Sequence, residues 1–195
     1  MSSGRRPAIF IDRDGTISHE VGYVNHPTRF RLFPYAAEAV RLANRSGWLV
    51  VVVTNQAGVA RGYFPESLVH EVHSRMRSAL ESGGAHLDGI YYCPHHPAAM
   101  EPAYRQDCDC RKPRPGLVRR AEADLGVDLA RSFVVGDRHG DLELAWVVGA
   151  RGILVKTGYG LGELTFHGPR WSRPPDLVVE NLLEAVTSIV TEVPR

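Results

Sequence analysis

Short apolar runs alternate with stretches of helical spacing along most of the chain. The runs predicted to form strands are residues 8–12, 48–55, 87–94, 132–137, 152–157 and 176–181. Apolar residues at helical spacing predict helices over residues 35–46, 65–82, 116–125, 141–148 and 182–190. This β-α-β-α order predicts an α/β fold, with a mostly parallel sheet covered by helices on both faces.

Three longer stretches show no such periodicity: residues 15–34, 94–115 and 158–175. Irregular segments of this length are usually functional or disordered. No linker-like segment divides the chain, so we expect a single domain over residues 1–195 without a separate cap domain.

Composition is that of an ordinary globular protein, with 195 residues, 44% of them hydrophobic and 23% charged. A net charge of +1 argues against a large nucleic-acid footprint, so any recognition by charge is expected to be local. No run approaches the ~18 apolar residues that a membrane span needs. We therefore expect a cytoplasmic protein with no membrane partner, and a monomer as the simplest state.

Polar side chains stand at the ends of three predicted strands. Asp12 and Asp14 follow the first strand, Thr54 and Asn55 end the second, and Asp137 ends the fourth. In an open parallel sheet, ligands bind outside the carboxyl ends of the strands. These side chains are therefore expected to converge at one edge of the sheet.

The closely spaced aspartates have two interpretations. They fit a turn, in which Asp and Gly supply the backbone geometry. Their convergence with other polar groups favours a Mg²⁺ site, because this hard cation prefers carboxylate and carbonyl oxygens. An aspartate beside such a cation can attack phosphorus and form an aspartyl-phosphate. Thr54 and Asn55 would then donate hydrogen bonds to the phosphoryl group. Lys112 or Arg111 would supply positive charge, and Asp14 would transfer the proton.

Four segments resemble, in order, the motifs of haloacid-dehalogenase-superfamily phosphatases. They are DRDGT from Asp12, VVVTNQ ending at Gln56, CRKP containing Lys112 and VVGDRHGD ending at Asp141. The resemblance spans residues 9–150 and implies a Rossmann-like parallel sheet, in agreement with the pattern above.

The resemblance also implies roles for individual residues. Asp12 would be the nucleophile and Asp14 the general acid/base. Thr54 and Lys112 would hold the phosphoryl group. Mg²⁺ would be bound by Asp12, Asp137 and the backbone carbonyl of Asp14.

The three cysteines lie close together in the irregular segment near the middle of the chain. The spacing C-x-H followed by C-x-C is that of a tetrahedral zinc site in a loop over about residues 93–115. The expected ligands are Cys93, His95, Cys108 and Cys110, with His96 in reserve. Four protein ligands leave no open position, so the zinc is expected to be structural. The alternatives are a flexible loop with reduced cysteines, or histidines at the surface.

The zinc loop narrows the resemblance. GYV, TNQAGVARGYF, DGIYYCPHHP and CDCRKPRPG resemble the small phosphatases that act on heptose bisphosphates. This resemblance covers nearly the whole chain and implies removal of the 7-phosphate of D-glycero-D-manno-heptose 1,7-bisphosphate in nucleotide-activated heptose synthesis. The residues expected to contact substrate are Glu20, Gly22, Tyr23, Asn55, Gln56, Arg111 and Arg138. The alternative to substrate binding for Arg138, and for Arg61, is that each is an ordinary surface charge.

Other functions compete with this one. The related histidinol-phosphate phosphatases share the catalytic motifs and a similar zinc loop, and a polynucleotide 3′-phosphatase is disfavoured by the near-neutral charge. A zinc-stabilised binding protein with an inactive site is the alternative of another class. The chain departs from the heptose pattern at Ala57, where serine is expected, and Gly140 is expected to loosen the start of the following helix.

Overall fold

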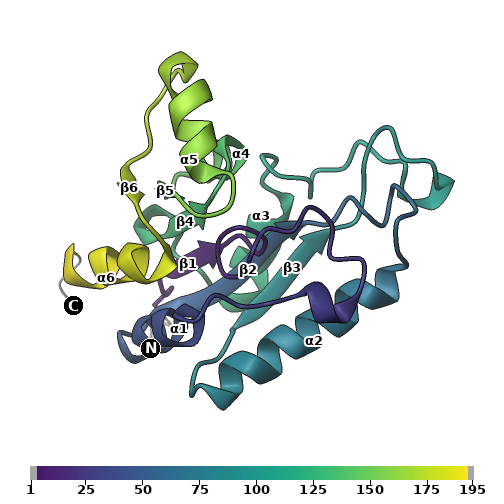
Figure 1. The fold of residues 1–195 in the computed structure, drawn as a ribbon. Helices are drawn as coiled ribbons and strands as arrows, with labels where there is room; N and C mark the ends of the chain where they lie inside the picture. Colours follow the sequence, from purple (N-terminus) through teal and green to yellow (C-terminus); the bar gives the residue numbers. More distant parts are fainter. Residues whose placement is uncertain (1–3, 193–195) are drawn as a thin grey trace.

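Parallel strands form one sheet at the centre of this computed structural model, which describes residues 4–192 (Figure 1). The six strands within that part of the chain are β1 (Ala8–Ile11), β2 (Leu49–Asn55), β3 (Gly89–Cys93), β4 (Phe133–Gly136), β5 (Arg151–Val155) and β6 (Leu177–Val179). Their order is β3-β2-β1-β4-β5-β6, and each neighbouring pair is parallel. The predicted parallel α/β fold is confirmed.

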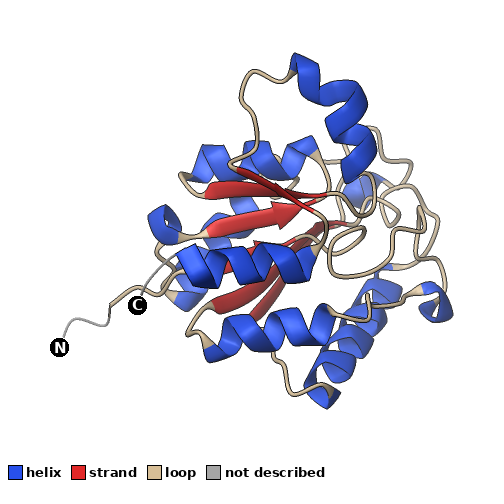
Figure 2. Cartoon of the chain, turned by 60° about the vertical axis from the view of Figure 1, so that its left-hand side comes forward, coloured by secondary structure: helices blue, strands red, loops and turns tan. Residues whose placement is uncertain are grey.

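Helices cover both faces of the sheet (Figure 2). The α-helices are α1 (Ala36–Arg45), α2 (Glu66–Ser82), α3 (Gly116–Leu125), α4 (His139–Val148), α5 (Gly160–Gly162) and α6 (Leu182–Glu192). Short 3₁₀ turns are η1 (Pro27–Arg29), η2 (Pro102–Tyr104), η3 (Leu129–Arg131) and η5 (Gly168–Arg170), and η4 (Glu163–His167) is a π-helical segment. Within the described residues no helix is long and apolar enough to cross a membrane.

The alternation of side chains along the strands divides the core into two layers. Ile9 and Ile11 of β1 pack toward α1, α2 and α6, whereas Ala8 and Phe10 pack toward α3 and α4. All four are fully buried. Because successive residues of a strand point to opposite faces, a continuous apolar run fills both layers. Burial of each large side chain contributes about 1.5–3 kcal/mol.

The segment from Gly158 to Pro175 differs from its expected irregular form. It contains α5, η4 and η5, which stand at the end of β5 and rise above the sheet (Figure 1). The expectation was wrong because glycine and proline hide helical periodicity here, and both are poor helix formers. Gly140 does not delay α4, which begins at His139. There Asp141 Oδ2 accepts the backbone N–H of Arg138 at 3.2 Å.

No separate cap domain stands over the sheet among residues 4–192. The expected domain, 1–195, includes residues 1–3 and 193–195, which lie outside the described residues. The loops between β1 and α1, between β3 and α3, and after β5 instead surround the carboxyl edge of the sheet. These loops position the site.

Candidate active site and metal centre

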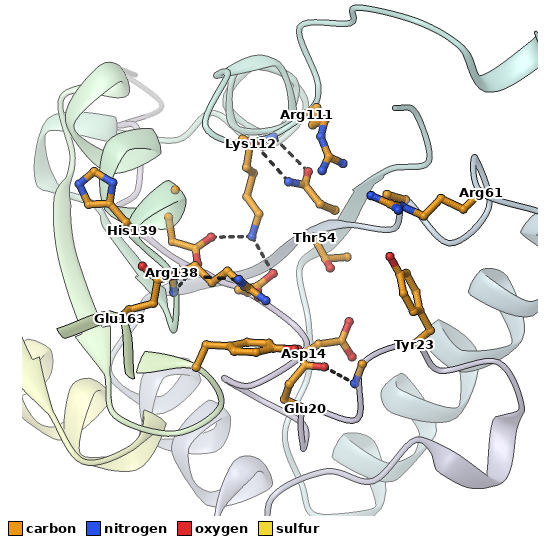
Figure 3. Close-up of a pocket in the computed structure, with 17 residues that line it drawn as sticks. Asp14, Glu20, Tyr23, Thr54, Arg61, Arg111, Lys112, Arg138, His139 and Glu163 are labelled. Atoms are coloured by element: carbon orange, nitrogen blue, oxygen red, sulfur yellow. Dashed lines mark hydrogen bonds and ion pairs between the residues drawn. The ribbon is translucent and has the colours of Figure 1, made fainter. Parts of the chain in front are cut away.

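The ends of neighbouring strands form the floor of a cavity of about 520 Å³ (Figure 3). Asp12 follows β1 and Thr54 is the last residue but one of β2, and these strands are adjacent in the sheet. The residues that line the cavity are Asp12, Asp14, Glu20, Gly22, Tyr23, Thr54, Asn55, Ala57, Arg61, Arg111, Lys112, Arg138, His139, Gly140, Asp141, Tyr159 and Glu163. Most side chains expected to act in catalysis or substrate binding therefore lie around one space. Gln56 and Asp137 lie outside this lining.

Lys112 is a buried cation that joins two carboxylates. Its Nζ atom donates to Oδ1 of Asp12 and to Oδ1 of Asp141, both at 2.6 Å, and to the carbonyl of Val53 at 2.9 Å. Burial works against its charge, yet the carboxylates of Asp12 and Asp141 raise the pKa of Lys112 above its usual range. Lys112 therefore brings a permanent positive charge to the floor of the cavity.

Asn55 fixes the backbone that carries this lysine. Its Oδ1 accepts the N–H of Lys112 at 3.0 Å, and its Nδ2 donates to the carbonyl of Lys112 at 3.1 Å. The expectation from sequence was that Asn55 contacts substrate. Although Asn55 lines the cavity, its amide binds the protein backbone, which holds the loop after the cysteines against the end of β2.

Three carboxylates crowd together beneath the cavity. Ligand oxygens of Asp12, Asp137 and Asp141 all lie within 4.8 Å of one another. Burial raises the pKa of Asp12 to about 6, and burial followed by the charge of Asp12 raises the pKa of Asp137 to about 8. A hard divalent cation favours the ionised form of such groups, so the donor set fits Mg²⁺.

Asp141 belongs to this cluster, and the residue-by-residue reasoning from sequence assigned it no role. It ends the fourth quoted motif, which was the available signal. Asp14 is expected to contribute its backbone carbonyl to the metal, and its carboxylate is not part of the cluster. It accepts hydrogen bonds from Arg13 and Gln56.

Two glycines hold Asp137 closely. A Cβ atom on Gly15 or on Gly158 would lie 2.1 Å from Oδ2 of Asp137, and both glycines have positive φ, at 85° and 58°. The same Oδ2 accepts the backbone N–H of Tyr159 at 2.8 Å. Only glycine permits this approach, because any side chain would displace the carboxylate.

Arginines stand at two sides of the cavity rim. Arg61 and Arg111 come from the β2 and cysteine-loop side, whereas Arg138 follows β4 (Figure 3). The guanidinium of Arg138 lies 3.7 Å from the ring centre of Tyr159 and 3.8 Å from Oε1 of Glu163. Sequence reasoning missed Tyr159 and Glu163, which lie in the segment expected to be irregular.

An acidic and aromatic wall closes another side. Glu20 accepts the backbone N–H of Gly22, and burial raises the pKa of Glu20. Tyr23 packs edge-on against Tyr63, with ring centres 4.7 Å apart. The structure therefore brings the expected residues Glu20, Gly22 and Tyr23 to the cavity from the loop after β1.

The cysteine loop folds into a second candidate metal centre. The Sγ atom of Cys110 lies 3.1 Å from those of Cys93 and Cys108, and 3.4 Å from Nδ1 of His95. Burial raises the pKa of Cys93 to about 11, so this thiol resists ionisation unless a cation binds it. Three sulfurs and one imidazole nitrogen suit tetrahedral zinc. His96 stays outside the cluster, where its Nδ1 accepts the N–H of Ala98.

Known proteins resemble this chain in sequence. Residues 109–185 match the HAD-hydrolase-like family model. The D-glycero-beta-D-manno-heptose-1,7-bisphosphate 7-phosphatase of Escherichia coli K12 is 44% identical over 154 residues, covering 78% of this chain and 80% of that protein. The protein of the same description from Haemophilus ducreyi is 40% identical over 183 residues, covering 93% and 97%.

A solved structure agrees over nearly the whole chain. The D,D-heptose 1,7-bisphosphate phosphatase of B. bronchiseptica, crystallised with magnesium and phosphate, has a TM-score of 0.84 and 32% identity, covering 96% of this chain and 99% of that one. A second one, from Burkholderia thailandensis, has a TM-score of 0.70 at 24% identity and supports the fold alone.

The parallel sheet and the aspartates at its strand ends, with a buried lysine between them, define a HAD-like phosphatase. The chain belongs to the family of the D-glycero-beta-D-manno-heptose-1,7-bisphosphate 7-phosphatases.

Proposed function

We propose that this protein removes the 7-phosphate of D-glycero-β-D-manno-heptose 1,7-bisphosphate through an aspartyl-phosphate on Asp12. The observation that carries the proposal is the contact between Asp12 and Lys112 at the floor of a cavity rimmed by arginines. A floor of this kind suits phosphoryl transfer, and a basic rim suits a substrate with a second phosphate. The family relationship agrees with this substrate.

In the first step, a carboxylate oxygen of Asp12 attacks phosphorus and the bond from phosphorus to the 7-oxygen breaks. Asp14 gives its proton to that oxygen, which leaves as the hydroxyl group of the sugar. Lys112 and the hydroxyl of Thr54 hold the phosphoryl oxygens and offset the charge that develops on them.

In the second step, water attacks the phosphorus of the aspartyl-phosphate while Asp14 takes its proton. The bond between phosphorus and the Asp12 oxygen breaks, which releases inorganic phosphate and restores the carboxylate. Asp12, Asp137 and the Asp14 backbone carbonyl would hold Mg²⁺, with Asp141 beside them. The metal would neutralise charge on the transferring phosphoryl group.

The rim is proposed to recognise the rest of the substrate. Arg61 and Arg111 on one side, and Arg138 on the other, offer charge to the 1-phosphate. Tyr159 and Glu163 hold Arg138 in place. Glu20 at the wall would accept hydrogen bonds from sugar hydroxyls.

The cysteine cluster is proposed to bind structural zinc. Arg111 and Lys112 follow Cys110 directly, so a metal that orders this loop also places both cations. We further propose that the protein is a monomer and works in the cytoplasm. Its partner would be a small sugar phosphate and not a nucleic acid.

The test is phosphate release from the α and β anomers of heptose 1,7-bisphosphate and from histidinol phosphate, measured side by side with Mg²⁺. We expect the highest kcat/KM with the β-bisphosphate. A preference for histidinol phosphate would overturn the substrate assignment. No release from any of the three would instead favour the inactive binding protein.

A further inference from the structure

A buried arginine stands between the two catalytic aspartates in sequence. The side chain of Arg13 is large and charged, yet it is only 2% exposed. Its Nε donates to Oδ1 and Oδ2 of Asp14 at 3.1 Å, and one terminal nitrogen donates to Oδ2 at 2.7 Å. A planar guanidinium that binds both oxygens of a carboxylate fixes the plane and direction of that carboxylate.

Two further acceptors fix the guanidinium itself. The nitrogen that binds Asp14 also donates to Oε1 of Gln56 at 2.8 Å, and the other terminal nitrogen lies 3.3 Å from Nε2 of His73. Arginine has no acceptor, so the ring nitrogen of His73 must accept. Burial, followed by the charge of Arg13, lowers the pKa of His73 to about 3, which keeps the ring neutral and able to accept.

Gln56 extends this series of hydrogen bonds to a second catalytic group. Its Nε2 donates to Oδ2 of Asp14 at 3.0 Å and to Oγ1 of Thr54 at 2.9 Å. Because the Thr54 oxygen accepts this bond, its own hydroxyl proton remains free to point at a phosphoryl oxygen. One amide therefore sets the orientation of both Asp14 and Thr54.

We propose that His73, Arg13 and Gln56 form a buried positioning chain that orients the acid/base Asp14 and the phosphoryl donor Thr54. This chain of hydrogen bonds begins at His73 on α2 and ends at the cavity. His73 and Arg13 themselves are outside the cavity lining. Gln56, expected from sequence to contact substrate, is a positioning residue in this proposal. The inference rests on the proposed function, in which Asp14 transfers the proton.

A purely structural role makes a different prediction. If His73 only tied α2 to the sheet, replacing it would lower stability and affect all substrates equally. If it positions Asp14, the loss should depend on the leaving group. An alkyl oxygen leaving a sugar needs a proton, whereas the phenolate of p-nitrophenyl phosphate leaves without one. General acid catalysis contributes about 10²–10⁴-fold, and small misplacement of such a group costs about 10²-fold.

The experiment compares His73→Leu with His73→Gln in the full chain with Mg²⁺. Leucine removes the acceptor, whereas glutamine offers a neutral amide oxygen in its place. We expect His73→Leu to lower kcat/KM for the heptose bisphosphate about 10- to 100-fold and for p-nitrophenyl phosphate by less than about 3-fold. We expect His73→Gln to recover most of the loss. His70→Leu is the matched control on the same helix, where His70 contacts Tyr92 instead, and it should leave both values unchanged.

Two further measurements keep the result decisive. Thermal unfolding reports whether His73→Leu folds. If His73→Leu does not fold, Gln56→Met tests the same chain of hydrogen bonds from its other end. Equal losses on the two substrates, or no loss, in a folded His73→Leu variant would overturn the positioning of Asp14. Because Gln56 also binds Thr54, Gln56→Met should lower kcat/KM for both substrates, and for the bisphosphate by more; equal losses there would likewise count against the positioning of Asp14. If the wild type hydrolyses p-nitrophenyl phosphate but not the bisphosphate, the proposed substrate fails instead. The comparison is then made with histidinol phosphate as the alkyl ester.

Discussion

The ammonium nitrogen of Lys112 lies 2.6 Å from Oδ1 of Asp12, so the proposed nucleophile and a permanent cation are in direct contact. The side chains are 6% and 13% exposed, and burial of this degree strengthens their attraction. The contact leaves Oδ2 of Asp12 free of lysine. In the proposed mechanism, the oxygen that lysine does not hold is the one that attacks phosphorus.

Replacing Asp12 with asparagine tests this nucleophile. An amide oxygen cannot form the aspartyl-phosphate, so we expect turnover to fall more than about 10³-fold while the fold and the zinc content persist. Phosphate release and near-UV circular dichroism are the measurements. Activity close to wild type in a folded Asp12→Asn variant would remove Asp12 from that role.

Replacing Cys110 with serine tests the link between the zinc loop and the cavity. We expect Cys110→Ser to lose zinc and to lower activity about 10-fold or more, because Arg111 and Lys112 then lose their anchor. Metal content by mass spectrometry and phosphate release report the two effects. His96→Asn is the control, since His96 lies in the loop but outside the cluster, and it should keep its zinc. Full activity without zinc would contradict the link.

Replacing Gly158 with alanine tests the packing around Asp137. The new Cβ would lie 2.1 Å from Oδ2 of Asp137, at a backbone φ of 58°, and must displace the carboxylate. We expect weaker Mg²⁺ activation, with the Mg²⁺ concentration for half-maximal activity raised about 10-fold or more. Gly162→Ala is the matched control because nothing lies within 4 Å of its Cβ. An unchanged Mg²⁺ requirement in Gly158→Ala would mean that this packing is irrelevant to the metal.

The pKa values of Asp12 and Asp137 predict how Mg²⁺ stabilisation depends on pH. Their folded-state values of about 6 and about 8 lie above the ordinary 3.8, so the stability tied to their protonated forms is full below about pH 4. It is lost as the pH rises through about 6 and then about 8. Mg²⁺ binds the ionised carboxylates, releases their protons and offsets the free-energy cost of burying ionised groups.

We therefore expect the rise in Tm on adding Mg²⁺ to be larger near about pH 8.5 than near about pH 5.5. Calorimetry at both values is the measurement, and Asp137→Asn should flatten the difference because the asparagine does not titrate. A Tm increase that is equal at the two pH values would show that these carboxyls do not govern the binding of Mg²⁺.

Replacing Arg138 with alanine tests recognition beyond the reacting phosphate. Loss of one charge-assisted contact costs about 1.5–3 kcal/mol, so kcat/KM for the bisphosphate should fall about 10- to 100-fold. We expect p-nitrophenyl phosphate, which has no second phosphate, to be affected far less. Steady-state kinetics on both substrates give the comparison. Equal losses would assign Arg138 to the reacting end of the substrate.

The strands and helices could be predicted because local patterns determine them. The apolar run of β2 fills two core layers at once, and the apolar positions of α1 repeat at helical spacing. Because the carboxyl ends of parallel strands meet at one edge of a sheet, the sequence was enough to predict that Asp12, Thr54 and Asp137 lie at the same edge. These inferences need only short stretches of sequence and a general property of parallel sheets.

Other features depend on distant contacts that no local pattern reveals. Arg13 looks like a solvated charge between two aspartates, yet it is buried, where it donates hydrogen bonds to His73, 60 residues away, and to Gln56. Glu163 reaches the cavity from a segment whose glycines and proline conceal its helical turns. Such positions follow from tertiary packing, which local propensity does not encode.

The two sides of the cavity rim have separate origins in the fold. Arg61 and Arg111 come from loops on the β2 and β3 side of the sheet, whereas Tyr159 and Glu163 follow β5 on the other side. The proposed nucleophile Asp12 lies between them, directly after β1. Single rim residues such as Arg61 or Glu163 could therefore be exchanged on one side while Lys112, Gly158 and the opposite side stay unchanged, and natural divergence toward new phosphate esters has the same freedom.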